Sequence, residues 1–329
     1  MAINLTAIQP HKVSTDLSGY ITYIYGAPKT GKTTLAVQME KSLLLAFEPG
    51  YHALPGVMAQ DVTSWAEMRQ VYRDLKKPEV KEMFKTVIID TIDIAADRCK
   101  KYICNQNDIE DLGELGYGKG WTKFKDEFNE IFRGLTQLGY AVVFLGHDKE
   151  ATIDNSDGTQ TRIVRPALSA SSREVIAGMA DIYGYAHQVR ANEMSVLTLR
   201  SPDGSISCGS RFKYLPNEIT MNYNSLVEAL QEAIEREAAE NNGKFITEER
   251  IVGPTEKEYD FDALKKEFET LVGELMNKDQ TYYAPKITDI VDKYLGKGNT
   301  VNKCSRDQVE AIDLITSELK ELMQAEGIA

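Results

Sequence analysis

The sequence contains few cysteines, and their spacing suits neither a cross-linked chain nor a zinc site. There are four Cys in 329 residues, none in a C-x-x-C pair and none beside a histidine. A disulfide framework or a structural zinc site needs Cys or His residues at short, regular intervals. We therefore expect buried thiols, with Cys99 and Cys104 among them, in a reducing compartment.

Long apolar segments are also missing. The amino-terminal stretch MAINLTAIQPHKVSTDLSG has no continuous apolar run, and nowhere are eighteen consecutive residues apolar. A signal peptide or a membrane-spanning helix would need such a run. The chain is nevertheless 42% apolar over 329 residues, which is enough for a substantial core and excludes a disordered tail. We expect a soluble, cytoplasmic protein with no membrane partner.

Positive charge is scarce overall. The formal net charge of −12 argues at first against a nucleic-acid partner, because phosphate binding depends on Lys and Arg. Residues 1–225, however, hold 25 Lys+Arg against 27 Asp+Glu, whereas residues 226–329 hold 13 against 23. The acidity therefore belongs to the last third of the chain, and the first 225 residues are close to neutral.

The first two thirds of the chain alternate short β-rich runs with longer helical patterns. This alternation is typical of an α/β fold with a mostly parallel sheet, whose buried strands are apolar on both faces. The predicted strands are Tyr20–Tyr25, Ser42–Phe47, Thr86–Asp90 and Ala141–Gly146. Between them, Ser64 and Glu67 form a capping box that opens a helix, and Trp121–Leu138 places aromatic residues at helical spacing.

The pattern changes after Asp148 toward antiparallel pieces. An Asp203-Gly204 turn between two β-rich runs predicts a hairpin that extends the sheet. From residue 226 a charged helix leads into a polar linker, and further on lie two apolar stripes at helical spacing, the last helix being capped by Ser305. We therefore divide the chain into a core of residues 1–225, a charged helix and linker of residues 226–258, and a small helical module of residues 259–329.

A phosphate-binding loop follows the first predicted strand. The segment from Gly26 to Thr33 fits G-x-x-x-x-G-K-[ST] between a strand and a helix-forming run, the context that the motif requires. Backbone N–H groups of such a loop wrap the β-phosphate, Lys32 reaches the β and γ oxygens, and the Thr33 hydroxyl holds Mg²⁺. The expected ATP-binding residues are Gly26, Ala27, Pro28, Lys29, Thr30, Gly31, Lys32, Thr33 and Thr34. A plain glycine turn before a helix is the alternative interpretation.

Three polar residues at predicted strand ends complete an ATPase site. Asp90 ends a buried strand and is expected to hold Mg²⁺ through water. Glu48 and Lys32 are the expected catalytic residues. Glu48 is the candidate for orienting the attacking water, and the alternative is that it is a surface glutamate in a strand-exit turn. His147 follows another strand and is either a sensor of the γ-phosphate or an ordinary loop residue.

These motifs resemble a known family. The runs LLLAFEPGYHAL and TVIIDTIDIAAD, and the segment from Asp111 to His147, look like the RecA-like P-loop ATPase core. The chain is more closely similar to phage nucleotide-binding proteins, the Sak-type single-strand annealing proteins, in which the GYGKG segment is a narrower signal. By position, Glu48 matches the water-activating glutamate, and His147 stands where many RecA proteins have glutamine. The resemblance implies ATP and Mg²⁺ as cofactors, the host-cell cytoplasm, and a homo-oligomer, either ring or filament.

The resemblance also directs attention to two basic segments. RecA-type cores contact DNA through loops after the third and fourth core strands, where this chain has an acid-free stretch from Gly158 to Ser172. The expected DNA contacts are Arg162, Arg165 and, one residue beyond the stretch, Arg173; a solvated hairpin is the alternative. Arg211 and Lys213 look like the basic pair that RecA-type subunits offer to a neighbour's ATP, or they are surface cations.

The function expected from these features is a RecA-like recombination ATPase. It would bind single-stranded DNA, promote annealing or strand exchange, and work with a single-stranded-DNA-binding protein. One alternative is a nucleotide-dependent assembly or replication-loading module without recombinase activity, and another is a small-molecule kinase. The carboxyl-terminal module is similar to small helical modules of phage recombination proteins, which suggests partner docking, although its apolar stripes also suit its own core.

Overall fold

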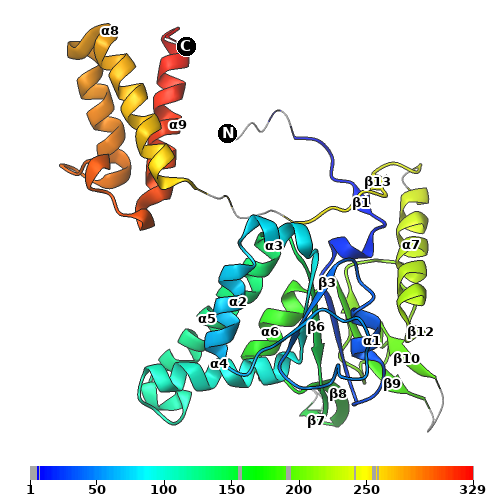
Figure 1. The fold of residues 1–329 in the computed structure, drawn as a ribbon. Coiled ribbons are helices and arrows are strands. Elements are labelled where there is room, and N and C mark those ends of the chain that lie inside the picture. Colours follow the sequence, from blue (N-terminus) through cyan, green and yellow to red (C-terminus); the bar gives the residue numbers. More distant parts are fainter. Residues whose placement is uncertain are drawn as a thin grey trace. The chain divides into compact units, whose positions relative to one another are not determined.

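The computed structural model describes residues 6, 8–154, 158–189, 194–240, 242–253, 257 and 259–328. They fall into two compact units, a larger one of Pro10–Glu256 and a smaller one built mainly from Lys257–Ala329 (Figure 1). All the sequence motifs for nucleotide binding lie in the larger unit.

The larger unit is built on a nine-stranded sheet. Its strand order is β12-β10-β9-β2-β6-β5-β3-β4, and β11 also pairs with β9. The predicted strands are present as β2 (Thr22–Gly26), β3 (Ser42–Ala46), β5 (Thr86–Asp90) and β6 (Ala141–Gly146). The others are β4 (Ala59–Asp61), β9 (Ile182–Gln188), β10 (Ser195–Thr198), β11 (Gly209–Ser210) and β12 (Glu218–Thr220). Neighbours from β9 to β4 are parallel and the remaining pairs antiparallel, which confirms the predicted α/β fold with a mostly parallel sheet.

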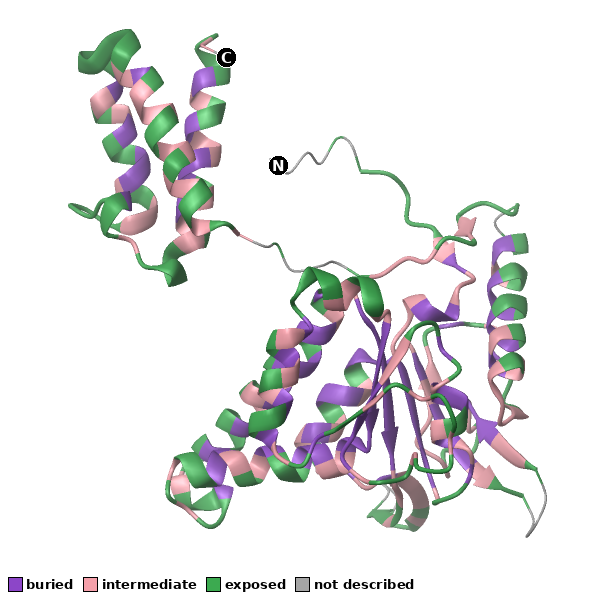
Figure 2. Cartoon of the chain, in the orientation of Figure 1, coloured by how far each residue is buried: buried purple, intermediate pink, exposed green. Residues whose placement is uncertain are grey.

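Helices cover both faces of this sheet (Figure 1). One face packs against α2 (Trp65–Asp74), α4 (Ile92–Gln106), α5 (Lys119–Gln137) and α6 (Ala170–Met179), and the other against α1 (Lys32–Ala36) and α7 (Tyr223–Glu240). Successive strand residues point into opposite layers, so that Ile89 joins the first core and Ile88 the second, both fully buried. Figure 2 shows the central strands buried along their length, which explains why their sequences are apolar at every position.

Helix α1 ends sooner than its sequence predicts. The helix-forming run continues past the P-loop, but α1 stops at Ala36 and residues 37–39 form turns. Lys41 then adopts a φ of 42°, and β3 begins at the next residue. Because Leu35 and Met39 are buried in the same apolar layer as β3, the chain turns back after five helical residues.

The hairpin predicted around Asp203-Gly204 does not form. β10 and β11 pair with β9 instead of with each other, and both lie antiparallel on the same edge of that strand. Residues 199–208 leave this edge between the two pairings. A turn signal is local, whereas the pairing depends on which segments fit the free edge of β9. A hairpin does form between β7 (Asp148–Asp154) and β8 (Gln160–Pro166), whose residues pair over the full length of both strands.

Helix α7 is part of the larger unit. We expected the core to end at residue 225, but the compact unit continues to Glu256. The apolar face of α7 is buried against the sheet through Leu226, Leu230 and Ile234. The helix is highly charged only on its outer side, and its composition therefore conceals a core-forming stripe.

Part of the predicted linker after α7 is also anchored to the larger unit. β13 (Ile246–Thr247) pairs in parallel with β1 (Val13–Ser14). The Arg250 guanidinium then donates to the backbone oxygens of Ser18 (3.1 Å) and Lys85 (2.9 Å), near the amino ends of the central strands. Composition does not reveal these contacts, because backbone groups and a single side chain make them.

The smaller unit is the predicted helical module. It contains α8 (Phe261–Leu295), which kinks at Asp279, and α9 (Val309–Ala325). Their apolar faces enclose a separate core that includes Leu275, Tyr283, Ile287, Val291, Ile312, Ile315 and Leu319. The predicted capping boxes are confirmed, with Ser305 and Gln308 ahead of α9 and Ser64 and Glu67 at α2. Within the described ranges, no helix is both long and apolar enough to span a bilayer.

Candidate functional site

The loop between β2 and α1 follows a left-handed path at its glycines. Gly26 has a φ of 155°, and a Cβ at this position would lie 2.0 Å from the backbone oxygen of Ala186 on β9. Gly31, with a φ of 90°, stands immediately before α1. Side chains are disfavoured at such φ values, and at Gly26 the neighbouring backbone leaves no space for one. The β9 backbone therefore explains why the loop starts with glycine.

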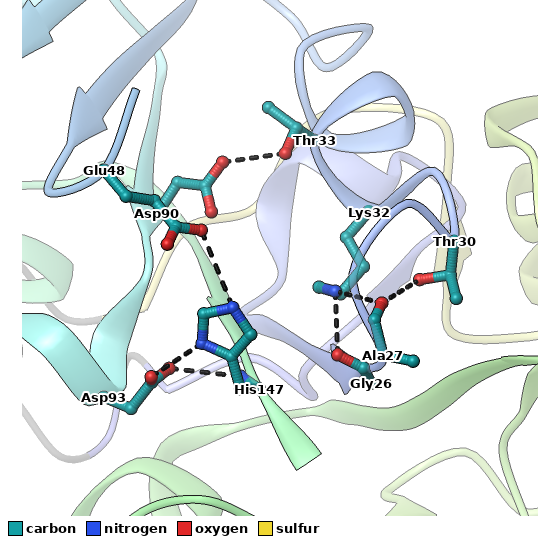
Figure 3. Close-up of polar contacts among 9 residues, drawn as sticks. All are labelled: Gly26, Ala27, Thr30, Lys32, Thr33, Glu48, Asp90, Asp93 and His147. Atoms are coloured by element: carbon teal, nitrogen blue, oxygen red, sulfur yellow. Dashed lines mark hydrogen bonds and ion pairs between the residues drawn. The ribbon is translucent and has the colours of Figure 1, made fainter. Parts of the chain in front are cut away.

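Lys32 is held inside this loop. The residue is only 7% exposed, and its Nζ donates to the backbone oxygens of Gly26 (2.9 Å) and Ala27 (2.8 Å) (Figure 3). Burial lowers the pKa of Lys32, and the nearby Asp90 carboxylate acts against this shift. The hydrogen bonds of the ammonium go to neutral carbonyl oxygens, which the oxygens of a phosphate can replace.

Thr33 and Asp90 meet across the carboxyl edge of the sheet. Thr33 Oγ1 donates to Asp90 Oδ2 at 2.7 Å, although β6 lies between the strands that end in the P-loop and in Asp90. Asp90 is 4% exposed, and burial raises its pKa while the Thr33 hydroxyl acts to lower it. A hydroxyl and a carboxylate in contact are the oxygen ligands that Mg²⁺ prefers.

These two side chains fit a magnesium ion that is shared with a nucleotide. Among the described residues, no group of three or more His, Cys, Asp or Glu is arranged to hold a metal by itself. Mg²⁺ usually keeps several waters and binds through one or two protein ligands plus substrate phosphates. The donor set at Thr33 and Asp90 matches that pattern.

Glu48 and His147 face each other beside the P-loop. His147 Nε2 lies 3.7 Å from Glu48 Oε1. On the other side of the ring, Asp93 Oδ2 lies 2.8 Å from His147 Nδ1, and Asp93 Oδ1 accepts the His147 backbone N–H at 3.1 Å. Figure 3 shows the three side chains in a row next to Lys32. The structure thus brings Lys32, Thr33, Glu48, Asp90 and His147 to one place, as predicted from their positions at strand ends.

Asp93 is a site residue that the sequence analysis missed. It lies in the first turn of α4, three positions after Asp90 in the run TIDIAAD. A carboxylate in the helical turn that directly follows a strand-end aspartate returns toward the same edge of the sheet. That spacing is the signal that could have identified it.

Burial also affects the candidate water-orienting glutamate. It raises the pKa of Glu48, while the neighbouring His147 lowers it. A carboxylate with a raised pKa is a stronger base, provided that it remains ionised at the working pH. The half-buried position of Glu48 therefore suits proton transfer better than a surface turn would.

A comparison with protein families decides the class of this nucleotide site. Residues 18–211, more than half of the chain, match the AAA domain family. The chain belongs to the AAA domain family. The matched residues run from before β2 to just after β11 and include the P-loop, Glu48, Asp90 and His147. The larger unit is therefore an AAA-type P-loop NTPase domain, and use of ATP and Mg²⁺ follows from the family in general terms.

A relative matches beyond the AAA domain. The chain is 29% identical over 332 positions to the SPbeta prophage-derived uncharacterized protein YorG of Bacillus subtilis (strain 168). The match covers 98% of this chain and 99% of the relative. The similarity therefore includes the smaller helical unit as well as the AAA domain.

The predicted DNA contacts in the AAA domain differ in whether their positive charge has an acidic partner. Arg162 forms an ion pair with Glu150 across the β7–β8 hairpin, and its charge is therefore partly satisfied. Arg165 stands directly opposite Lys149 in the same hairpin. Desolvation, followed by the positive charges of Arg165 and Arg173, lowers the pKa of Lys149. Arg165 also has a buried Nε without a hydrogen-bond partner among the described residues.

Arg211 and Lys213 lie at the other end of the AAA domain's sheet. β11, which precedes Arg211, pairs with the first residues of β9, whereas the P-loop follows the last residues of β2, beside the far end of β9. Arg211 forms an ion pair with Asp181 (3.2 Å), and Lys213 with Glu240 (2.9 Å). The structure does not bring these cations to the P-loop of their own chain. Their contact with a neighbour's nucleotide stays a prediction.

Proposed function

We propose that the chain is an ATP-binding, Mg²⁺-dependent ATPase that binds single-stranded DNA and promotes annealing or strand exchange. The convergence of Lys32, Thr33 and Asp90 beside the P-loop supports the nucleotide part. A cluster of like charges next to that site supports the nucleic-acid part. In the proposed function, ATP binding acts mainly as a switch that controls assembly and DNA affinity.

The nucleotide is held by the P-loop and by the two side chains that contact each other across the sheet. Lys32 exchanges its bonds to Gly26 and Ala27 for phosphate oxygens. Thr33 and Asp90, whose side-chain oxygens lie 2.7 Å apart, would hold Mg²⁺ together with water and phosphate oxygens. When bound, the ion neutralises the charge on the phosphate oxygens during transfer.

Hydrolysis depends on the row of Glu48, His147 and Asp93. Glu48 accepts the proton of the attacking water, and the pKa raised by burial strengthens it as a base. Asp93 accepts a hydrogen bond from Nδ1–H of His147, which leaves Nε2 directed toward Glu48. His147 thereby fixes the position of the Glu48 carboxylate and reports whether a γ-phosphate is present.

The nucleic-acid contact is formed by cations at the foot of the hairpin. Arg165 of the hairpin and Arg173 of α6 both act to lower the pKa of Lys149, and Lys149 and Arg165 stand directly opposite each other on paired strands. Like charges at such positions destabilise a hairpin unless an anion lies between them. In the described part of the chain, none of the three forms an ion pair. A phosphate backbone supplies the missing negative charge.

The position of this cluster connects DNA binding to the nucleotide. Lys149 follows His147 by two residues, and Asp148 between them accepts a hydrogen bond from the Tyr185 hydroxyl (3.2 Å). Tyr185 pairs with Tyr25 next to the P-loop. A displacement of His147 on ATP binding would therefore shift the first residues of the β7–β8 hairpin.

Assembly and origin complete the proposal. The near full-length similarity to a prophage-derived protein favours a phage origin and the host-cell cytoplasm. Arg211 and Lys213, at the end of the sheet away from their own P-loop, suit a contact with the ATP of an adjacent subunit in a ring or filament. The acidic helical unit suits docking of a partner such as a single-stranded-DNA-binding protein.

An annealing assay tests this function. Complementary oligonucleotides are mixed with the wild-type chain, with Lys32→Ala and with Lys77→Ala, whose surface ion pair with Asp74 lies far from the P-loop in sequence and serves as the control. We expect ATP to stimulate annealing by the wild type and the control and not by Lys32→Ala. Unchanged annealing by Lys32→Ala would overturn the mechanism. A nucleotide-dependent oligomer without DNA affinity would instead support an assembly or replication-loading module.

A further inference from the structure

Two aromatic side chains stand out on the surface between α4 and α5. Tyr117 is fully exposed, at 104% of its reference area, and Trp121 is 40% exposed in the first turn of α5. Large aromatic side chains usually bury most of their area, and exposed ones on a shared loop indicate a contact surface. Figure 1 shows this connection projecting from the side of the larger unit, beyond the helices that cover the sheet.

The backbone holds Tyr117 in this position. Gly116, Tyr117 and Gly118 all have positive φ, with 49° at Tyr117, a conformation that tyrosine rarely adopts. On one side, Asp111 and Glu114 form a capping box around a short 3₁₀ turn. The left-handed conformation is therefore maintained by built-in contacts at the price of strain.

The other side of the loop is fixed by close packing. A Cβ at Gly120 would lie 2.1 Å from the backbone oxygen of Leu112, so that only glycine permits this approach. Leu112 itself is 2% exposed and joins the core beneath α4 and α5. The loop that carries Tyr117 and the first turn of α5, which carries Trp121, are thus anchored to the core.

Trp121 lies on a helix, α5, that contacts cation-bearing helices on both sides. Trp121 packs edge-on against Phe124, with ring centroids 6.4 Å apart. Lys100 Nζ lies 6.0 Å from the centroid of the same Phe124 ring. Lys100 is also one of the charges that act on Lys149. On the other side of α5, Lys125 Nζ lies 3.1 Å from Glu174 Oε2 on α6, next in sequence to Arg173. The helix that carries Trp121 therefore packs against the helix that carries Arg173.

We propose that Tyr117 and Trp121 form a stacking site for unpaired bases, which extends the phosphate-binding cluster of Lys149, Arg165 and Arg173. This inference rests on the proposed DNA-binding function. Aromatic rings bind bases of any identity, and cations beside them follow the backbone. The site takes single-stranded nucleic acid, because the bases of a duplex are not available for stacking.

The acidic side chains of the loop determine where the bases and the phosphates of a bound strand lie. Glu114 accepts the backbone N–H groups of Glu110 (2.9 Å) and Asp111 (2.7 Å), and Asp111 accepts that of Gly113 (2.8 Å). These two acidic side chains disfavour phosphate at the loop itself. The bases therefore lie on the aromatic rings while the backbone lies toward the hairpin.

Tryptophan fluorescence tests the stacking directly. The chain has two Trp, and Trp65 is 1% exposed in the core, so that Trp121 is the residue which solvent and ligands can reach. Titration of the full chain with oligo(dT), in the presence of ATP and Mg²⁺, is expected to quench its fluorescence. Trp121→Phe is expected to abolish the quenching while it still binds the oligonucleotide, because a phenyl ring retains part of the stacking.

Binding measurements with paired variants complete the test. Tyr117→Ala and Trp121→Ala are each expected to weaken oligo(dT) binding by about tenfold, with the dependence on salt unchanged. Met83→Ala removes another exposed apolar side chain, 55% exposed at the end of α3 (Pro78–Met83), and is expected to bind like the wild type.

The outcomes distinguish this inference from the function on which it rests. Wild-type binding without Trp121 quenching, together with unchanged affinity of both alanine variants, would overturn the stacking site and leave the DNA-binding function intact. Loss of self-association in those variants with full DNA affinity would also overturn it, since the loop would then contact protein. Absence of oligo(dT) binding by the wild type would contradict the proposed function itself.

Discussion

The carboxylate of Asp93 contacts both the ring and the backbone of His147. Asp93 Oδ2 lies 2.8 Å from the ring Nδ1, and Asp93 Oδ1 accepts the backbone N–H at 3.1 Å. An acceptor at Nδ1 holds a proton on that nitrogen and orients the ring so that Nε2 faces Glu48, 3.7 Å away. A residue of α4 therefore sets the orientation of the residue that connects β6 to β7.

Replacement of Asp93 tests this positioning role. Asp93→Asn keeps the size of the side chain and removes its charge, and we expect kcat for ATP hydrolysis to fall by about tenfold or more with KM nearly unchanged. Asp97→Asn, on the same helix with a 75% exposed side chain, is the control. Nitrogen-15 NMR of His147 gives an independent measure, because the wild type should show protonated Nδ1 and the variant a mixture of tautomers. A wild-type ring protonated only at Nε2 would refute the role of Asp93.

The acidic limb of the pH profile reports on Glu48. Because burial raises the pKa of Glu48, its carboxylate is lost on acidification at a higher pH than an ordinary glutamate. His147 lowers that pKa, so that His147→Ala should move the acidic limb of kcat/KM to still higher pH. Activity measured from pH 5 to pH 9 checks the direction. A limb that moves to lower pH in His147→Ala would show that another group is titrating.

Arginines with and without an ion-pair partner, in the hairpin and on α6, should differ in their effect on DNA binding. Arg165→Ser and Arg173→Ser each remove a cation that has no ion-pair partner among the described residues. We expect each to weaken oligo(dT) binding and to lower the slope of log Kd against log salt by about 0.7. Arg162→Ser, the matched control, should have a smaller effect because Arg162 is paired with Glu150. Equal losses in all three variants would argue against a contact confined to the foot of the hairpin.

Local patterns in the sequence predicted the centre of this protein well. The strands β2, β3, β5 and β6 are short apolar runs that need burial on both faces, and the P-loop motif lies between a strand and a helix as required. Lys32, Glu48, Asp90 and His147 follow the ends of parallel strands, which meet at one edge of a sheet. Their convergence therefore follows from topology and not from details of packing.

Features that depend on distant partners could not be predicted in the same way. The hairpin around Asp203-Gly204 fails because β10 and β11 both find a better partner in β9. Arg250 looks like a linker residue until the backbone oxygens that it contacts are known. Asp93 resembles any polar residue in a first helical turn, and only its contact with His147 gives it a role. In the last two cases the deciding contact spans more than fifty residues of the sequence.

The most direct test of the account is ATP hydrolysis measured with and without single-stranded DNA. We predict slow, Mg²⁺-dependent turnover by the wild type that oligo(dT) stimulates, and loss of turnover in Glu48→Gln with ATP binding retained. Lys32→Ala should lose both binding and turnover. Turnover that oligo(dT) does not change, in a protein that does not bind oligo(dT), would contradict the proposed coupling between the nucleotide site and DNA.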